Sequence, residues 1–254
     1  IRDYSGKGFV FGAQDVGVHV QGAFTGDLAA EMLADIGCRY VLVGHSERRQ
    51  FQGETSELVA EKFMAARRAG LVPVLCVGES LHQRETGHTE WVIEKQLKPV
   101  FDLAGKHGFA EAVIAYEPVW AIGTGLTPTP QDIAQAHAHI RAQLSKLIGG
   151  RASGMRILYG GSVKPSNARE LLAIDNVNGA LVGMPSSLSA TTGGTHTMYV
   201  DAGSANAGSL YLIAGTTALV VGIAAGSWLV YRRRRRQRTG CPTTAPSSVT
   251  LVAG

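Results

Sequence analysis

The sequence predicts an α/β fold in which six strand–helix units form most of an eight-stranded barrel. Between residues 8 and 183, short apolar runs alternate with longer segments of helical periodicity. The runs are continuously apolar, as in parallel strands that are buried on both faces. Polar residues follow nearly every run, and a barrel brings all strand ends to one rim, whereas an open sheet would scatter several of them. An incomplete barrel is therefore favoured over an open sheet.

The expected strands and helices follow one another in a regular order. Strands are the short apolar runs, and helices are the segments in which apolar residues recur three and four positions apart. The clearest helix start is at Thr129, whose hydroxyl can cap the helix before Pro130 in its first position. The expected strands are 9–11, 40–43, 72–77, 112–116, 156–159 and 179–182, and the expected helices are 26–36, 54–69, 89–106, 130–148 and 167–173.

The charge and the cysteines exclude several classes of protein. The formal net charge is +4, but the arginines at 232–236 and 238 exceed this value, so the rest of the chain is slightly negative. No basic stretch with interleaved aromatic residues suggests nucleic-acid binding. The three cysteines, Cys38, Cys76 and Cys241, are odd in number and widely spaced, which argues against a disulfide framework and against a zinc site. Reduced thiols in a cytoplasmic protein without a metal ion are expected.

The character of the chain changes after residue 183. Residues 184–209 are rich in Ser, Thr and Gly and are expected to form a linker. Residues 210–231 contain no charged side chain and have about the ~20-residue length of a membrane-spanning helix. The arginine run follows this segment directly, as a stop-transfer flank would, which favours a transmembrane helix over a buried core helix. Residues 232–254 are expected to be a basic, disordered tail, and residues 1–183 the partial barrel.

Five motifs occur in the order in which one enzyme family has them. They are Val-Gly-His-Ser-Glu-Arg-Arg at 43–49, Ala-Tyr-Glu-Pro-Val-Trp-Ala-Ile-Gly-Thr-Gly at 115–125, Tyr-Gly-Gly-Ser-Val at 159–163, and the shorter strings at 22–26 and 73–79. Together they closely resemble the signatures of the triosephosphate isomerase family from about Gly8 to Gly183. The resemblance implies a TIM (β/α)8 barrel that interconverts dihydroxyacetone phosphate and D-glyceraldehyde 3-phosphate, a step of glycolysis and gluconeogenesis.

The resemblance also assigns catalytic roles. Glu117 matches the carboxylate base that moves a proton between neighbouring carbons of the substrate. His45 matches the neutral histidine that donates a hydrogen bond to the enediolate, and a helix N-terminus after Gly44 is expected to keep its pKa low. Glu47 matches the acid beside this histidine and is expected to support it. This chemistry needs side chains and backbone groups, and no cofactor.

Phosphate binding and subunit contacts are further implications of the resemblance. Gly123, Ser162 and Gly183 match the residues that line the phosphate site, where glycine lets the backbone approach the anion closely. The segment 120–127 matches a lid that closes over the substrate and excludes water. The loop 22–26 matches one that inserts into a second subunit, with Thr25 reaching toward the neighbouring site. The implied partners are a sugar phosphate and a second copy of the chain.

The chain departs from the family pattern at three places. It starts after the position of the family's Asn-x-Lys motif, so the catalytic lysine is absent and reduced activity is expected. Met184 stands where the family has a second glycine, and the linker and apolar segment replace the final helix. The alternative function is therefore a noncatalytic, membrane-tethered phosphate-binding remnant, or the product of a chimeric gene. A different phosphate-binding barrel is disfavoured, because such enzymes lack the lid string that begins at Glu117.

Overall fold

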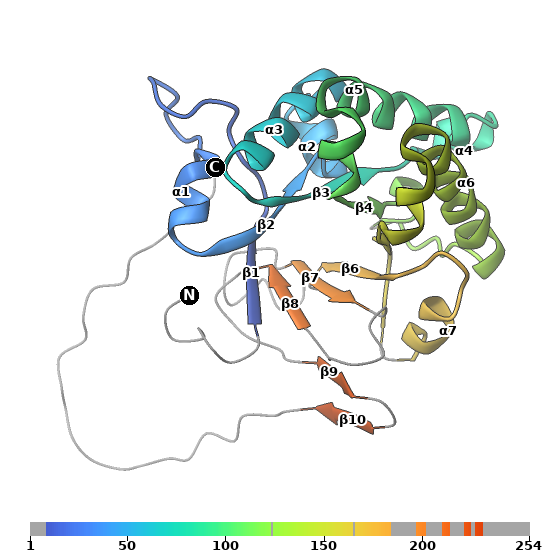
Figure 1. Cartoon of the computed structure of the whole chain (residues 1–254). Coiled ribbons are helices and arrows are strands. Elements are labelled where there is room, and N and C mark those ends of the chain that lie inside the picture. Colours follow the sequence, from blue (N-terminus) through green and yellow to red (C-terminus); the bar gives the residue numbers. More distant parts are fainter. Residues whose placement is uncertain are drawn as a thin grey trace, which may run out of the picture.

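Six parallel strands form the frame of the molecule (Figure 1). The computed structural model describes residues 9–122, 124–164, 166–183 and four short strands between residues 197 and 230. Each of the first five strands pairs in parallel with the next one along the chain. The six strands are β1 (Phe9–Ala13), β2 (Cys38–Val43), β3 (Val72–Val77), β4 (Val113–Tyr116), β5 (Ile157–Tyr159) and β6 (Gly179–Gly183). The six predicted strands are all present, and they fit an incomplete TIM barrel.

Two further strands occupy the gap between β6 and β1. β7 (Thr197–Asp201) pairs antiparallel to β6, and β8 (Leu210–Ile213) pairs antiparallel to β7. β8 then runs parallel to β1, which closes a ring of eight strands. Of the two closing strands, β7 therefore runs opposite to the six parallel strands, whereas β8 has the same direction as they do.

The membrane-spanning helix predicted for residues 210–231 is not supported. The described parts of this segment are strands: β8, β9 (Val221–Ala224) and β10 (Ser227–Val230), of which the last two pair antiparallel to each other. In the part of the chain that the structure describes, no helix is long and apolar enough to cross a membrane. The physical reason is that apolar composition alone does not distinguish a helix from strands, and the β-branched residues of this segment favour strands. The tail at 232–254 lies outside the described residues, and the domain boundaries at 184, 210 and 232 stay predictions.

Helices connect the parallel strands and cover their outer face (Figure 1). The five predicted helices are present, with boundaries that differ by a few residues. Two short helices, α2 and α4, were not resolved by the periodicity, because fewer than two turns show no helical repeat. The helices are α1 (Ala30–Asp35), α2 (Ser46–Phe51), α3 (Ser56–Arg68), α4 (Leu81–Glu85), α5 (Thr89–Ala110), α6 (Pro130–Ile148) and α7 (Ala168–Leu172), with short 3₁₀ turns at Val119–Ala121 and Gly149–Gly154.

The predicted start of α6 shows how the local sequence sets an element boundary. The Thr129 hydroxyl accepts a hydrogen bond from the backbone N–H of Asp132 at 3.2 Å, and the Asp132 carboxylate accepts one from the N–H of Thr129 at 2.9 Å. This reciprocal pair is a capping box, with Pro130 in the first helical position. The boundary expected from the sequence is therefore confirmed.

Side chains that alternate along the strands form two separate apolar layers. Tyr40 and Leu42 of β2 belong to the barrel interior, whereas Val41 and Val43 pack in the layer between strands and helices. On β4, Ala115 belongs to the interior layer and Tyr116 to the outer layer. Because successive strand side chains point to opposite faces, the residue after Tyr116 is directed inward at the mouth of the barrel. That residue is Glu117.

Candidate active site

A tight turn after β2 places His45 at the rim of the barrel. Gly44 has a φ of 72°, in the left-handed region that favours glycine. A Cβ atom at this position would lie 2.7 Å from Arg49 and 2.8 Å from Val59, so the turn also needs the absence of a side chain. His45 is the N-cap of α2, and its Nδ1 accepts a hydrogen bond from the backbone N–H of Glu47 at 3.4 Å.

Glu117 leaves the end of β4 as a buried carboxylate. Its backbone N–H donates to the carbonyl of Val77 at 2.8 Å, which extends the β3–β4 ladder by one residue. Its side chain accepts a hydrogen bond from the backbone N–H of Ser46 at 3.0 Å and contacts the Ser46 hydroxyl at 3.4 Å. The residue is 2% exposed. A carboxylate in this position is held from β4 and from the N-terminus of α2 together.

His45 and Glu117 face each other directly. The Nε2 atom of His45 lies 2.8 Å from a carboxylate oxygen of Glu117. Because Nδ1 of His45 accepts the N–H of Glu47, the proton of the neutral imidazole belongs on Nε2, which donates to Glu117. The fold therefore brings a carboxylate and an imidazole, from positions 72 residues apart, into contact at one rim.

The predicted low pKa of His45 is not what the structure gives. Burial of the ring lowers the pKa of His45, but the hydrogen bond to Glu117 and the negative charges of Glu117 and Glu47 raise it by more. Its pKa consequently lies above the usual 6.5. The helix N-terminus is present as expected, but the pKa is set by burial, which lowers it, and by the carboxylates of Glu117 and Glu47, which raise it.

The predicted supporting role of Glu47 has a different physical basis in the structure. The contact that Glu47 makes with His45 comes from its backbone N–H, while its side chain belongs to an exposed residue. The backbone bond fixes the orientation of the imidazole ring, and the charge of the Glu47 carboxylate contributes to the raised pKa of His45. The catalytic role of the Glu47 side chain stays a prediction.

The predicted phosphate-binding residues lie at the ends of neighbouring strands, as far as they are described. Ser162 is exposed in the segment after β5, where its carbonyl accepts a hydrogen bond from Asn167 at 3.2 Å. Gly183 is the last residue of β6, which pairs with β5. Gly123 and Met184 lie outside the described residues. Ser162 and Gly183 thus lie toward the same rim as Glu117, and their contact with phosphate stays a prediction.

A buried carboxylate anchors the start of the predicted lid. Glu79, which follows β3, is fully buried and accepts hydrogen bonds from the Trp120 indole at 3.0 Å and the Tyr116 hydroxyl at 3.1 Å. Arg84 stacks over the Trp120 ring at 4.4 Å. Burial raises the pKa of Glu79, and hydrogen bonds from its backbone, Tyr116 and Trp120 only partly offset this. The sequence marks Glu79 as a polar residue after a strand, but its partners could not be read from spacing.

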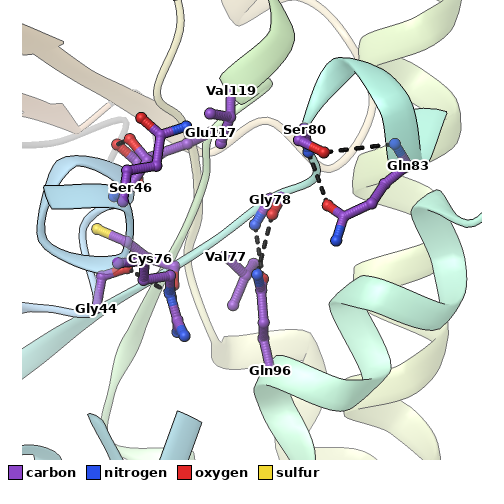
Figure 2. A pocket seen from close by; sticks show the side chains of 12 residues that line it. Gly44, Ser46, Cys76, Val77, Gly78, Ser80, Gln83, Gln96, Glu117 and Val119 are labelled. Carbon is purple, nitrogen blue, oxygen red and sulfur yellow. Dashed lines mark hydrogen bonds between the residues drawn. The ribbon is translucent and has the colours of Figure 1, made fainter. Parts of the chain in front are cut away.

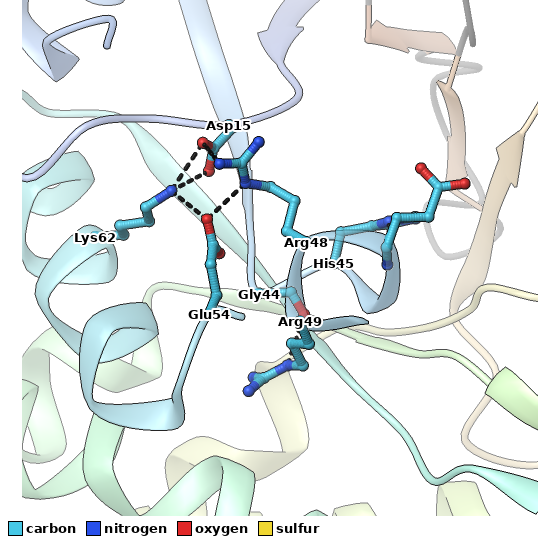
Figure 3. Close-up of polar contacts among 8 residues, drawn as sticks. Asp15, Gly44, His45, Arg48, Arg49, Glu54 and Lys62 are labelled. Atoms are coloured by element: carbon cyan, nitrogen blue, oxygen red, sulfur yellow. Dashed lines mark hydrogen bonds and ion pairs between the residues drawn. The ribbon is translucent and has the colours of Figure 1, made fainter. Parts of the chain in front are cut away.

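Four charged residues brace the beginning of α2 (Figure 3). Lys62 of α3 contacts both oxygens of Asp15 at 2.8 Å and one oxygen of Glu54 at 2.5 Å. Arg48 of α2 lies 2.9 Å from Asp15 and 2.6 Å from Glu54. Glu54 and Lys62 are buried. This charge cluster of Asp15, Arg48, Glu54 and Lys62 ties the segment after β1 to α2 and α3, and so holds the helix that His45 caps.

The two carboxylates of the charge cluster respond differently to burial. Burial raises the pKa of Asp15 by more than its hydrogen bond to Lys62 lowers it. For Glu54, burial again raises the pKa, but the combined hydrogen bonds from Lys62 and Arg48 lower it below its usual range. The sequence could not show this cluster, because its members are ordinary surface types at wide spacing.

A cavity of about 230 Å³ lies behind the carboxylate of Glu117 (Figure 2). It is bordered by the start of α2, the ends of β3 and β4, and the middle of α5. Its walls carry several polar side chains and few apolar ones. The lining residues are Gly44, Ser46, Arg49, Gln50, Cys76, Val77, Gly78, Ser80, Gln83, Gln96, Glu117 and Val119. Gln96 was not expected from the sequence, since it lies within an ordinary amphipathic helix.

Comparison with known proteins gives one consistent result. The sequence model of the triosephosphate isomerase family matches residues 1–193. A triosephosphate isomerase of Stenotrophomonas maltophilia strain K279a is 57% identical over 183 residues, which cover 72% of this chain and 73% of that protein. A triosephosphate isomerase of Xanthomonas campestris pv. campestris strain 8004 is 56% identical over the same share of each chain.

Proposed function

Because the chain belongs to the triosephosphate isomerase family, we propose that it interconverts dihydroxyacetone phosphate and D-glyceraldehyde 3-phosphate. The observation that carries this proposal is the 2.8 Å contact between the His45 imidazole and the buried Glu117 carboxylate at the barrel rim. A base and a neutral donor at one point are what a proton shift between neighbouring carbons requires. The reaction belongs to glycolysis and gluconeogenesis, and it accords with a cytoplasmic location.

Glu117 acts as the base in this proposal. Its carboxylate removes a proton from the carbon beside the substrate carbonyl, and the electron pair of that C–H bond forms the enediolate. The carbonyl oxygen becomes the oxyanion and accepts a hydrogen bond from His45 Nε2–H. The hydroxyl proton of the second oxygen passes to the oxyanion, the carbon-derived proton returns from Glu117 to the neighbouring carbon, and the second oxygen becomes the new carbonyl. The substrate enters by separating the two side chains, so their direct contact is the resting arrangement.

The phosphate group is held by backbone groups in this proposal. Gly123, Ser162 and Gly183 supply N–H donors near the ends of β4, β5 and β6, and closure of segment 120–127 excludes water. Glu47 supports His45 through its backbone. Proton transfer of this kind is carried by side chains and needs no metal or organic cofactor.

A homodimer is part of the proposal. The segment from Val20 to Ile36 exposes a series of large apolar side chains, which is more than a monomer usually presents in one short stretch. Met32 of α1 and Ile36, the C-cap residue of the same helix, lie one turn apart, so they share a face. The exposed side chains are Val20, Phe24, Leu28, Met32 and Ile36.

The dimer is tested by charging this apolar face. Met32→Glu should shift the chain from dimer to monomer in size-exclusion chromatography with light scattering, because a carboxylate would be buried without a partner. Leu103→Glu is the matched control, since Leu103 is similarly exposed on α5. A mass that does not change between the Met32→Glu variant and the native chain would contradict the dimer.

The catalytic proposal is tested with a coupled assay for glyceraldehyde 3-phosphate formation. Glu117→Gln should lower kcat by about 10³–10⁴-fold, since the substitution removes the base but keeps the shape. His45→Gln should lower it by about 10²–10³-fold, the effect of losing one aligned donor. Glu61→Gln, an exposed glutamate of α3, is the matched control and should retain full activity. Native-level turnover in the Glu117→Gln variant would refute the assignment.

A further inference from the structure

Gln96 holds the backbone of Gly78 with both ends of its side-chain amide (Figure 2). The carboxamide oxygen accepts the N–H of Gly78 at 2.8 Å, and the carboxamide nitrogen donates to the carbonyl of Gly78 at 3.0 Å. Gln96 lies in the middle of α5, whereas Gly78 is the first residue after β3. One side chain therefore satisfies both polar groups of one peptide residue at a strand end.

The strand ladder stops where this contact begins. The carbonyl of Val77 accepts the N–H of Glu117 at 2.8 Å, which is the last rung between β3 and the chain leaving β4. The N–H and carbonyl of Gly78, one residue further on, are paired by Gln96 instead of by a neighbouring strand. Backbone groups in such a place need partners, because leaving a buried one unpaired costs about 1–3 kcal/mol.

Gly78 is in turn packed directly against the catalytic residue. A Cβ atom added to Gly78 would lie 1.7 Å from the backbone carbonyl oxygen of Glu117 and 2.7 Å from its carbonyl carbon. The two main chains therefore approach as closely as a glycine allows. A displacement of Gly78 would be transmitted to the main chain of Glu117 without an intervening flexible side chain.

We propose that Gln96 is a positioning residue for the isomerisation, which it serves by clamping Gly78 and thereby setting the place at which Glu117 leaves β4. This proposal rests on the proposed function, since it concerns the base of that reaction. Gln96 lines the same cavity as Glu117, but the carboxylate contacts that the structure gives are to His45, Ser46 and Cys76. It acts through the backbone of Gly78.

The expected consequence is a loss of rate more than a loss of binding. A displacement of about 1 Å from the productive geometry can cost ~10²-fold in rate. The residues proposed to bind phosphate follow other strands, and the clamp does not touch the described ones. Removing the clamp should therefore lower kcat and leave KM nearly constant.

The test compares two substitutions of the same type in the full-length chain. Gln96→Met keeps the length of the side chain and removes both hydrogen bonds to Gly78. Gln143→Met is the matched control, because Gln143 of α6 also donates its amide to another element, at Glu94 of α5, but outside the active site. Melting temperature, kcat and KM are measured for each, together with amide hydrogen exchange of the peptides that contain Gly78 and Glu117.

The clamp predicts a specific pattern. Gln96→Met should lower kcat by about 10–100-fold with KM changed by less than about 3-fold, and should speed amide exchange at Gly78 and Glu117 by about 10-fold or more. Gln143→Met should lower the melting temperature without either effect. Equal kcat in the Gln96→Met variant and the native chain, or unchanged exchange around Glu117, would overturn the proposal.

A failure of the proposed function can be distinguished from a failure of the clamp. If the native chain shows no turnover, the proposed function fails, while hydrogen exchange around Glu117 still decides whether the clamp exists. If the Gln96→Met variant does not accumulate as a folded protein, Gln96→Glu replaces it, because it keeps the acceptor for the Gly78 N–H and removes only the donor. A kcat for Gln96→Glu equal to that of the native chain would likewise overturn the proposal.

Discussion

The start of α2, which carries His45, and the end of β4, which carries Glu117, are held by different kinds of contact. At the His45 side, the charge cluster joins two cations to two carboxylates between the start of α2 and the middle of α3. At the Glu117 side, the supports are neutral, namely the ladder bond to Val77 and the packing against Gly78, which Gln96 clamps. Two groups that lie within hydrogen-bond distance are therefore supported mainly by different kinds of contact, and the N–H of Ser46 at the start of α2 links the two sides.

Charged and neutral supports are disturbed by different changes. Charged supports lose their contribution when a partner titrates or is removed, because the remaining charge stays buried. Neutral supports depend on shape and on complete hydrogen bonding, so that pH acts on them only through neighbouring groups. Substitutions and pH changes can therefore disturb one side of the site while leaving the other intact.

The largest effect on the free energy of unfolding is expected from breaking the charge cluster. Lys62→Met should lower the free energy of unfolding by about 3–5 kcal/mol, because Asp15 and the buried Glu54 lose a shared cation. Urea unfolding at neutral pH gives this difference. Lys98→Met on α5 is the matched control, since Lys98 pairs with Asp102 on the surface and such pairs contribute little. Equal losses in the two variants would contradict the role of the cluster.

Acid should weaken the same cluster in the native chain. The folded-state pKa of Glu54 is lowered, so its stabilising contribution is present above the unfolded-state pKa and is lost as the pH falls through the folded-state value. The effect of Lys62→Met should therefore shrink in acid, because protonated Glu54 no longer needs the cation. A constant difference between the two chains down to low pH would argue against this linkage.

A smaller effect on the free energy of unfolding is expected from His137, which lies on the Glu117 side of the site. His137 of α6 is completely buried, packs edge-on against Tyr116 and donates from Nδ1 to the carbonyl of Asn176 at 3.1 Å. Burial lowers its pKa from 6.5 to about 4, and the hydrogen bond to Asn176 only partly offsets this. Within the described residues its Nε2 has no hydrogen-bond partner.

The sign of the pH dependence follows from this shift. Between the unfolded-state and folded-state values, the unfolded chain binds the proton and the folded chain does not, so unfolding becomes easier as the pH falls below about 6.5. The loss should approach ~3 kcal/mol near the folded-state value. His137→Gln keeps a donor for Asn176 and should flatten this slope in urea titrations at pH 7.5 and pH 5. An unchanged slope would contradict the buried neutral imidazole.

The parallel part of the fold was predictable, since buried strands appear as continuously apolar runs and amphipathic helices as periodic ones. The short helices α2 and α4 gave none, and the apolar segment 210–231 carried a hydrophobic signal that does not separate a strand from a helix. His45 and Glu117 were accessible through their motifs. The pKa of His45 could not be predicted from its motif, because it depends on the carboxylate that the fold brings opposite it.

The supports of the site were the least predictable part. Asp15 and Lys62 are 47 residues apart, and Gln96 looks like any polar position of a surface helix. Their significance comes from contacts that only the folded chain creates. Glu79 was visible as a polar residue after a strand, but its partners Tyr116 and Trp120 were not. Tertiary contacts over long sequence separations thus set the limit of inference from a single sequence.

The most direct test of the proposed chemistry follows a single proton. The full-length chain is incubated with dihydroxyacetone phosphate in D₂O, and carbon-bound deuterium in the product is measured by NMR. If Glu117 transfers the proton and exchanges it with solvent, deuterium should enter the product with the native chain and should be lost in the folded Glu117→Gln variant. Isomerisation by the Glu117→Gln variant at the native rate, or a folded native chain that produces neither isomerisation nor deuterium incorporation, would contradict the account.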